Sequence, residues 1–400
     1  MSKSSQKVLW LTVEPPGRQQ GGGAIREFHL LRAMARRATT VLVMRGALQE
    51  EVLLPELAAV VELDVTQVQA PASKTLRRAR DLSWALRKLP AEAQENEQMR
   101  LAIAASELPL HEFDHVLVEH IGLAPLLPEG RQNHWILNLQ QLGSRRARQA
   151  LGLARTRRQR WAVGQELKKA VALEQWAMGA YDLCCVPSDE DAAELGPGAV
   201  VVPNGVDVQA WKPTPIPAEP RVILTGTLNT AANLDGAQWL AHEVMPLVRR
   251  LVPDVTLDIV GRNPVPDFEA LGREPGITLH VDVPDVAVHL KGARVATVPL
   301  RIGSGTRIKA LEAMASGRPV VGTTIGLEGL HLNAGVEARV ADDADGFADG
   351  IVRLLKDDEA ATAMAEAARR HVEAEFDWDV IAGRFADRVL SEATGPYRAG

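Results

Sequence analysis

The sequence predicts two α/β domains, each built on a parallel sheet with helices on both faces. Apolar strand candidates alternate with helical segments in both halves of the chain, a pattern typical of doubly wound sheets. A turn and a proline-rich stretch near residue 205 separate the two series. The 400 residues are enough for two cores of ordinary size. We therefore predict two domains of similar architecture.

The N-terminal half opens with an apolar strand, a glycine loop that contains Gly21, Gly22 and Gly23, and an amphipathic helix. The glycines do not fit the G-x-G-x-x-G fingerprint, so a dinucleotide site is not indicated, and a plain surface loop stays open as an interpretation. The predicted strands cover 7–13, 40–44, 114–119, 135–139 and 182–188, and the helices cover 24–38 and 144–178. Residues 47–110 show no clear pattern.

The domain boundary is predicted where a turn signal meets a run of prolines. Asn204-Gly205 favours a turn, and four prolines follow between Pro213 and Pro220. The strand–helix alternation then restarts. Strands are predicted at 222–225, 255–260, 277–281, 295–300 and 319–323, with a helix from about Ala237 and a helical tail over 345–390. We place the domains at 1–204 and 205–376, with a terminal helical segment at 377–400.

The most informative stretch runs from Pro299 to Leu330, where a strand end is followed by a glycine-rich turn, a helix and another strand. Gly303 and Gly305 let the backbone approach a ligand. Ser304 or Thr306 can cap the helix. A helix start offers unpaired N–H groups and about half a positive charge, so anions bind readily there.

Lys309 and Glu312 lie three residues apart on this predicted helix, beside its apolar face. An exposed ion pair is the ordinary explanation for such spacing. The glycine turn before the helix and the apolar strand after it favour a binding site instead. A lysine near the turn suits a diphosphate, and a carboxylate one turn further suits sugar hydroxyls.

The stretch resembles the donor-binding segment of family 4 glycosyltransferases, the group 1 transferases with the GT-B fold. The resemblance implies two Rossmann-like domains that face a central cleft. The N-terminal domain is then on the acceptor side, the C-terminal domain binds the nucleotide-sugar donor, and the helix at 377–400 crosses back to the first domain. The string P-N-G-V-D at 203–207 is similar to the family's interdomain junction.

The resemblance also implies roles for single residues. A glutamate at the Glu312 position contacts the donor, whereas the family's second glutamate, eight residues earlier, is replaced here by Ser304. A subgroup writes this loop as G-x-G-T-R-x-K, which is similar to residues 303–309, and its backbone N–H groups are inferred to do part of the missing carboxylate's work. The implied donor site comprises Gly303, Ser304, Gly305, Thr306, Arg307, Lys309 and Glu312.

Further site residues are implied in both halves. In the family, the loop with Gly22 and Gly23 faces the cleft, near the donor phosphates and the acceptor. A histidine or other polar residue at the His120 position, directly after a buried strand, lies near the donor sugar; a strand-end histidine bonded to backbone is the alternative. The turn at 226–236 lacks the family's basic residue, so Lys309 must supply the cation, with Arg262 or Arg307. Lys309, Glu312 and His120 are the predicted catalytic residues. The acceptor side, with Asn138, Gln140 and Gln141, departs from the family.

The predicted function is a retaining, metal-independent glycosyltransferase of glycan biosynthesis. Its donor is a nucleotide-diphosphate sugar, it needs no cofactor, and its acceptor is an unidentified glycan, lipid-linked molecule or small molecule. Two alternatives stay open: a GT-B nucleotide-sugar epimerase, and a non-catalytic sugar-nucleotide-binding partner subunit. A nicotinamide oxidoreductase is disfavoured because neither half has the glycine fingerprint.

The bulk composition limits partners and compartment. A net charge of -6 gives no reason to expect nucleic acid. Cys184 and Cys185 are adjacent in an apolar run and read as core thiols, so we expect a reducing, cytoplasmic setting. No apolar run reaches the ~18 residues of a membrane span. Basic helices could still touch the inner membrane face, although a solvated helix face explains their charge as well. The basic residues are Lys74, Arg77, Arg78, Arg80, Arg145, Arg146, Arg148, Arg155, Arg157, Arg158 and Arg160.

Overall fold

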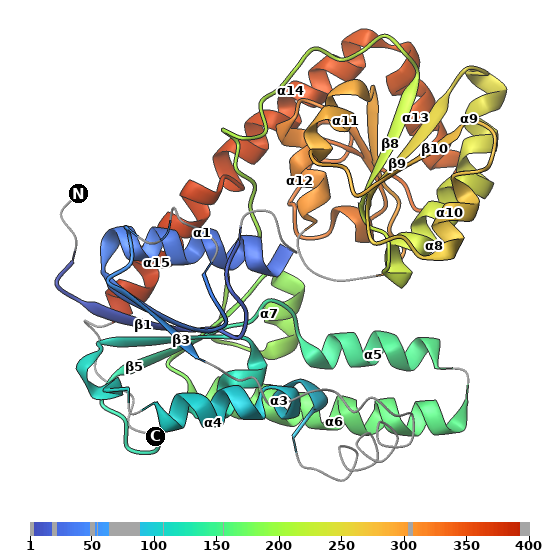
Figure 1. Cartoon of the computed structure of the whole chain (residues 1–400). Helices are drawn as coiled ribbons and strands as arrows, with labels where there is room; N and C mark the ends of the chain where they lie inside the picture. Colours follow the sequence, from blue (N-terminus) through green and yellow to red (C-terminus); the bar gives the residue numbers. More distant parts are fainter. Residues whose placement is uncertain are drawn as a thin grey trace. The chain divides into compact units, whose positions relative to one another are not determined.

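The computed structural model describes residues 4–17, 22–48, 53, 55–63, 89–106, 108–154, 156–302 and 307–392. The chain divides into two compact units. Unit 1 comprises Met1–Pro203 and Ile381–Gly400, and unit 2 comprises Asn204–Val380. Each unit holds one parallel sheet with helices packed against it, as predicted (Figure 1).

Unit 1 is built on a seven-stranded parallel sheet in the order β3-β2-β1-β4-β5-β6-β7. Its strands are β1 (Lys7–Leu11), β2 (Thr39–Arg45), β3 (Ala59–Leu63), β4 (His115–Glu119), β5 (His134–Asn138), β6 (Leu183–Val186) and β7 (Ala199–Val201). The strands β1, β4 and β6 contain the apolar runs VLWL, VLV and LCCV, because both faces of the sheet are covered.

Helices cover both faces of the unit 1 sheet. They are α1 (Gly22–Arg37), α3 (Ala91–Glu95), α4 (Glu97–Ala105), α5 (Gly143–Leu153), α6 (Arg157–Ala180), α7 (Asp189–Leu195) and α15 (Trp378–Glu392), with short 3₁₀ turns at η2 (Leu110–Glu112) and η3 (Ile121–Leu126). Trp10 points from β1 to α1, where Glu27 accepts from its indole at 3.2 Å, and to Phe385 of α15. Its neighbours Leu9 and Leu11 point to the opposite face and join the core with α3, α4 and α6.

The last helix belongs mainly to unit 1. From Ile381 onward its residues fall within that unit. The Arg37 guanidinium pairs with Asp387 at 3.1 Å, and the Gln6 amide donates to the Leu390 carbonyl at 3.2 Å. These contacts dock the C-terminal helix beside the first strand of the chain.

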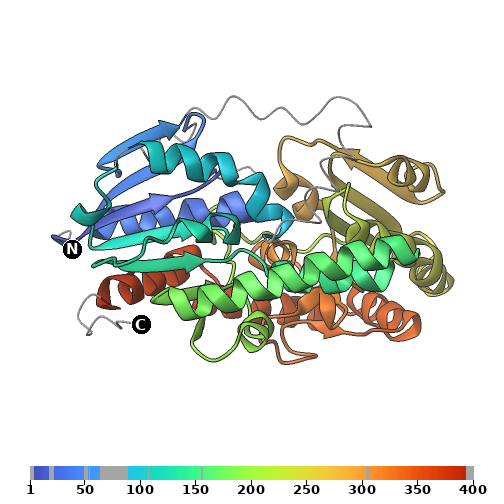
Figure 2. The same ribbon diagram turned by 90° about the horizontal axis from the view of Figure 1, so that it is seen from below.

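Unit 2 is built on a six-stranded parallel sheet in the order β10-β9-β8-β11-β12-β13. Its strands are β8 (Arg221–Thr227), β9 (Thr256–Arg262), β10 (Ile277–Val281), β11 (Val295–Val298), β12 (Val320–Gly322) and β13 (Arg339–Val340). The order reverses between β8 and β11, which is the topological switch point where open α/β sheets bind ligands. Figure 2 shows the same ribbon from below.

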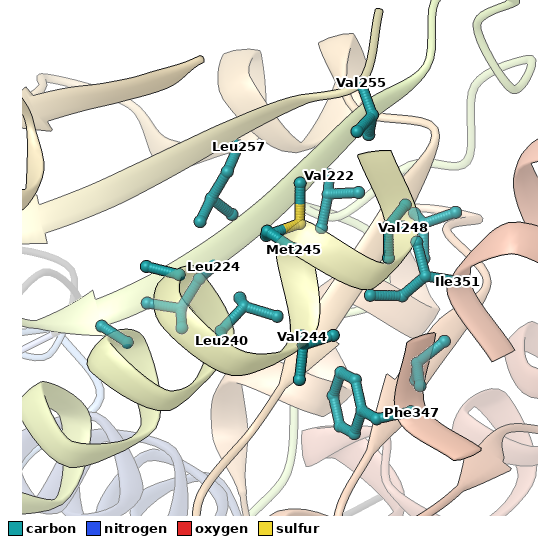
Figure 3. Packing of buried hydrophobic residues seen from close by; sticks show 14 of the residues in the cluster. Val222, Leu224, Leu240, Val244, Met245, Val248, Val255, Leu257, Phe347 and Ile351 are labelled. Carbon is teal, nitrogen blue, oxygen red and sulfur yellow. The ribbon is translucent and has the colours of Figure 1, made fainter. Parts of the chain in front are cut away.

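The unit 2 core lies between one face of the sheet and a group of helices. Apolar side chains of β8 and β9 pack against Leu240, Val244, Met245 and Phe347 (Figure 3). The helices of the unit are α8 (Ala231–Trp239), the π-helical turn η4 (Leu240–Val244), α9 (Met245–Leu251), α10 (Pro266–Leu271), α11 (Val286–Gly292), α12 (Ile308–Ala315), η5 (Ile325–Leu327), α13 (Ala344–Lys356) and α14 (Asp358–Glu375). Helices α11 and α12 contact β8, β9, β11 and β12.

One helix starts earlier than predicted. We expected a turn over residues 226–236 and a helix from about Ala237, but α8 begins at Ala231. The Thr230 side chain caps it by accepting from the Asn233 N–H. Gly236, taken for a turn residue, lies inside the helix; an added Cβ would come within 2.6 Å of the Pro299 oxygen. This glycine permits close packing of helix and strand rather than a turn. The short strands β3, β7 and β13 were also not predicted.

Candidate nucleotide-sugar site

The candidate site lies at the carboxyl edge of the unit 2 sheet. Gly226 on β8 pairs in register with Gly261 on β9, and Thr227 with Arg262. A Cβ on Gly261 would lie 1.8 Å from the Gly226 oxygen, so only glycine fits there. Because the strands are parallel, the turns that follow β8, β9 and β11 meet at this one edge.

The Lys309 ammonium reaches into the turn after β8. Lys309 is the second residue of α12, and its Nζ lies 2.6 Å from Oδ1 of Asn233 on α8. A Cβ added to Gly226 would lie 2.7 Å from the same Nζ. The cation therefore stands beside the end of β8, next to the turn in which the sequence has no basic residue.

Burial brings the pKa values of Lys309 and Glu312 toward neutrality. The pKa of Lys309 is lowered to about 8, mainly by desolvation and also by the nearby Arg307, whereas Glu312 opposes the shift. Desolvation raises the pKa of Glu312 to about 7, against the opposing charges of Lys309 and Arg262. Near pH 7 the ammonium is charged, and the carboxyl can either donate or accept a hydrogen bond. Perturbed groups of this kind are frequent in functional sites.

Arg307 occupies the N-cap position of α12, where Ser304 or Thr306 was expected. It makes no side-chain bond to the helix N–H groups. Its Nε donates to the Ile325 carbonyl at 3.1 Å, and Nη2 lies 3.5 Å from Glu328 Oε2. The guanidinium thus ties the start of α12 to η5. The four preceding residues of the predicted donor loop, Gly303, Ser304, Gly305 and Thr306, lie outside the described residues.

Two further features of this edge were missed from the sequence. Asn233 holds the Lys309 ammonium, and Arg301 makes a bidentate pair with Asp235 at 2.9 and 2.7 Å. Arg301 also lies 5.6 Å from the centre of the Trp239 ring. The Thr230-x-x-Asn233 spacing is a helix-start signal that would have moved Asn233 onto α8. Arg262, which was predicted, is the exposed last residue of β9.

Unit 1 brings another group of predicted residues together at its own carboxyl edge. His120 directly follows β4, and its Nε2 lies 3.4 Å from the amide nitrogen of Gln140 after β5. A Cβ on Gly23, at the start of α1, would lie 1.8 Å from Gln140 Oε1. Gly22 is the first residue of the same helix. Gln140 thus connects the two predicted positions, His120 and Gly23.

His120 has an unusual backbone. Its φ is 72° and its ψ is 138°, a combination that non-glycine residues rarely adopt. Burial lowers the pKa of the imidazole, with partial opposition from Glu14. The ring is therefore neutral near pH 7, and a neutral Nε2 can accept a hydrogen bond.

A buried polar network lies beside this group. The Asn138 amide donates to both oxygens of Glu119 at 2.9 and 3.1 Å and accepts from Arg26 at 3.0 Å. Arg26 also donates to the carbonyls of Val202 and Pro203, the last residues of unit 1 before unit 2. Burial raises the pKa of Glu119 to about 7. These bonds fasten the start of α1 to the chain segment that leaves the unit.

Among the described residues, no group of three or more His, Cys, Asp or Glu side chains is placed to hold a metal ion. Within the same ranges, no helix combines the length and apolar character needed to cross a membrane.

Curated relatives match parts of the chain. Glycogen synthase of Mycobacterium tuberculosis is 28% identical over 257 residues, which cover 59% of this chain and 60% of the relative. Phosphatidyl-myo-inositol mannosyltransferase of Mycolicibacterium smegmatis is 31% identical over 215 residues, covering 50% of this chain and 54% of the relative. The chain thus spans less than two thirds of the length of each of these relatives.

Solved structures share the fold across the chain. Sucrose-phosphate synthase from Thermosynechococcus elongatus superposes with a TM-score of 0.70 at 17% identity, covering 96% of this chain and 99% of the other. Anabaena HepE, solved in complex with UDP and glucose, has a TM-score of 0.63 at 15% identity and covers 96% and 100%. These neighbours and the two parallel sheets confirm the predicted GT-B class. Residues 219–357, which contain the Lys309 site, match the family model for glycosyl transferases group 1.

Proposed function

We propose that this protein is a glycosyltransferase that moves a sugar from a nucleotide-diphosphate sugar to an acceptor. The observation that carries the proposal is the Lys309 ammonium, held at the carboxyl end of β8 in a family-matched unit. A fixed cation at a topological switch point suits a diphosphate. The UDP complex of HepE and the name of a GDP-mannose-dependent relative support a nucleotide-sugar donor.

The chemical role of the site is to stabilise the leaving group. Breaking the bond between the anomeric carbon and phosphate places negative charge on the diphosphate oxygens. The Lys309 ammonium faces that charge from a partly buried position, where electrostatic attraction is stronger than in water. Glu312, with its pKa raised to about 7, is suited to hydrogen bonds with donor hydroxyls. His120, on unit 1, offers a neutral ring nitrogen for a sugar hydroxyl.

We further propose that transfer retains the anomeric configuration and uses neither a metal ion nor a cofactor. In this mechanism the acceptor hydroxyl enters on the face from which the diphosphate departs, and a donor phosphate oxygen takes its proton. The acceptor is a glycan, a lipid-linked molecule or a small molecule, and the relatives named for glycogen and for phosphatidyl-myo-inositol represent the first two classes.

A donor screen tests the proposal. Purified protein is incubated with a panel of UDP-, GDP- and ADP-sugars, and release of nucleoside diphosphate is followed with and without EDTA. Proton NMR of the products gives the anomeric configuration. We expect release from at least one donor and its loss in Lys309→Ala. A protein that neither binds nor turns over any nucleotide sugar contradicts the proposal, and an epimerised donor without acceptor identifies an epimerase.

We also propose a peripheral contact between the basic helices of unit 1 and the anionic inner face of the cytoplasmic membrane. Arg157, Arg158 and Trp161 are exposed at the start of α6, where a basic and aromatic surface suits lipid headgroups. Cys184 and Cys185 are free and buried, which fits a reducing compartment. Flotation with anionic vesicles should recover the wild type but not Arg157→Glu/Arg158→Glu. Equal recovery of both, or equal binding to neutral vesicles, contradicts this contact.

A further inference from the structure

Asn233 has a side chain whose two ends are both engaged. It is buried in α8, with 8% of its surface exposed. Its Nδ2 donates to the Thr227 carbonyl at 2.6 Å, and its Oδ1 accepts from the Lys309 ammonium at 2.6 Å. A carbonyl cannot donate and an ammonium cannot accept, so the chemistry of the two partners fixes the orientation of the amide. The oxygen must face the lysine.

The backbone of β8 leaves room for this arrangement. Gly226 has a φ of 152°, which L side chains rarely adopt. An added Cβ would lie 2.7 Å from Lys309 Nζ and 3.0 Å from Asn233 Nδ2. Any residue larger than glycine would displace the ammonium, the amide or both.

We propose that Asn233 is a positioning residue that holds the Lys309 ammonium at the carboxyl end of β8 so that its other N–H groups meet the donor diphosphate. This inference rests on the proposed function, because it needs a diphosphate at that place. Asn233 uses one of the three donors of the ammonium. The asparagine acts through the lysine and is not itself assigned a contact with the ligand.

Among the described residues, few charged groups act on the ammonium. Arg307 and Glu312 act on it from α12, with opposite signs. On β9, Arg262 acts on Glu312. On α8, Asp235 is paired with Arg301. Asn233 and Gly226, which line the position of the ammonium from α8 and β8, are neutral.

A pH dependence of ligand binding follows from this environment. The pKa of Lys309 is lowered to about 8, so the ammonium loses its proton as the pH rises through that value. Diphosphate binding should weaken over the same range. Because Asn233 Oδ1 stabilises the charged form, its removal should move the weakening to lower pH, and a carboxylate in its place should move it to higher pH.

Calorimetric titration with UDP and with GDP, from pH 6.5 to 9.5, tests the inference. We expect Asn233→Ala to weaken binding about tenfold or more at pH 7.5, consistent with loss of a hydrogen bond to a charged group. We expect the pH midpoint to fall in Asn233→Ala and to rise in Asn233→Asp. Gly226→Ala should weaken binding without changing any charge, and Gln238→Ala, which removes an amide from the same helix, should leave both affinity and midpoint unchanged.

Two outcomes overturn the inference separately from the proposed function. The inference fails if Asn233→Ala binds nucleoside diphosphates as the wild type does. It also fails if the variant weakens binding by the same factor at every pH, with an unmoved midpoint, because Asn233 then has a merely structural role. If Lys309→Ala loses binding while Asn233→Ala gives either of these results, the proposed function still stands. A wild type that binds neither UDP nor GDP, and that neither binds nor turns over any nucleotide sugar of the donor panel, overturns both.

Discussion

Replacing Glu312 by glutamine should stabilise the free protein at alkaline pH while it weakens donor binding. The pKa of the carboxyl is raised from its ordinary value of 4.5 to about 7, mainly by burial. Between these values the folded chain holds a proton that the unfolded chain has released. The stability contributed by the protonated carboxyl is therefore complete below pH 4.5 and is lost as the pH rises through 7.

The size of the effect follows from the same two values. Their difference, at about 1.4 kcal/mol for each pH unit, sets an upper limit of about 3 kcal/mol at pH 8. The attraction of Lys309 and Arg262 for the ionised carboxyl is already contained in the pKa of about 7, and solvent screening of the half-buried side chain reduces the gain below this limit. We expect Glu312→Gln to raise the free energy of unfolding by about 1–2 kcal/mol at pH 8. The gain should shrink steadily toward pH 4.5.

Urea unfolding at several pH values measures this difference. Glu366→Gln is the matched control, because Glu366 is exposed on α14 and lies 3.7 Å from Arg370. Its effect should be small at every pH. A Glu312→Gln variant that is no more stable than the wild type at pH 8, or whose gain does not depend on pH, would refute the argument from burial. A gain in stability with unchanged donor binding would refute the role assigned to the carboxylate.

Three further predictions concern the framework of the site. Arg318→Met should destabilise unit 2 by roughly 2–4 kcal/mol, at about 1 kcal/mol for each bond lost to backbone carbonyls, as measured by urea unfolding. Gly261→Ala should lower the free energy of unfolding by more than about 2 kcal/mol because its Cβ would meet a β8 oxygen. Gly152→Ala in α5, where there is open space, should raise it by about 0.5–1 kcal/mol. Equal shifts of the unfolding temperature in the two variants would contradict this. Arg26→Met should lower the unfolding temperature and increase proteolysis after Pro203, and an unchanged cleavage pattern would count against its fastening role.

Parallel strands were the most predictable part of the fold. Residues 277–281 form β10 as predicted, the apolar run at 7–13 contains β1, and the run at 135–139 overlaps β5 with a shift of one residue. Both faces of such a sheet are covered, so the strands read as apolar runs without alternation. The start of α8 was missed because Gly236 resembles a turn residue in sequence, although it serves the contact with Pro299.

The site was predictable only in part. Lys309 and Glu312 stand out because their spacing and the glycines before them are local features. Asn233 is 76 residues from Lys309, and nothing in either local stretch indicates that their side chains meet. The same holds for the contact between His120 and Gln140 and for the positive φ of His120, which arise from packing at the end of β4. Long-range contacts of this kind depend on the folded arrangement of the sheet.

A crystal structure of the protein with a bound nucleoside diphosphate would show whether Lys309 holds the leaving group. We expect diphosphate oxygens within hydrogen-bond distance of Lys309 Nζ, at the carboxyl end of β8, while Asn233 keeps its own bond to the ammonium. A diphosphate bound elsewhere, with Lys309 making no contact to it, would show that the ammonium does not have this role.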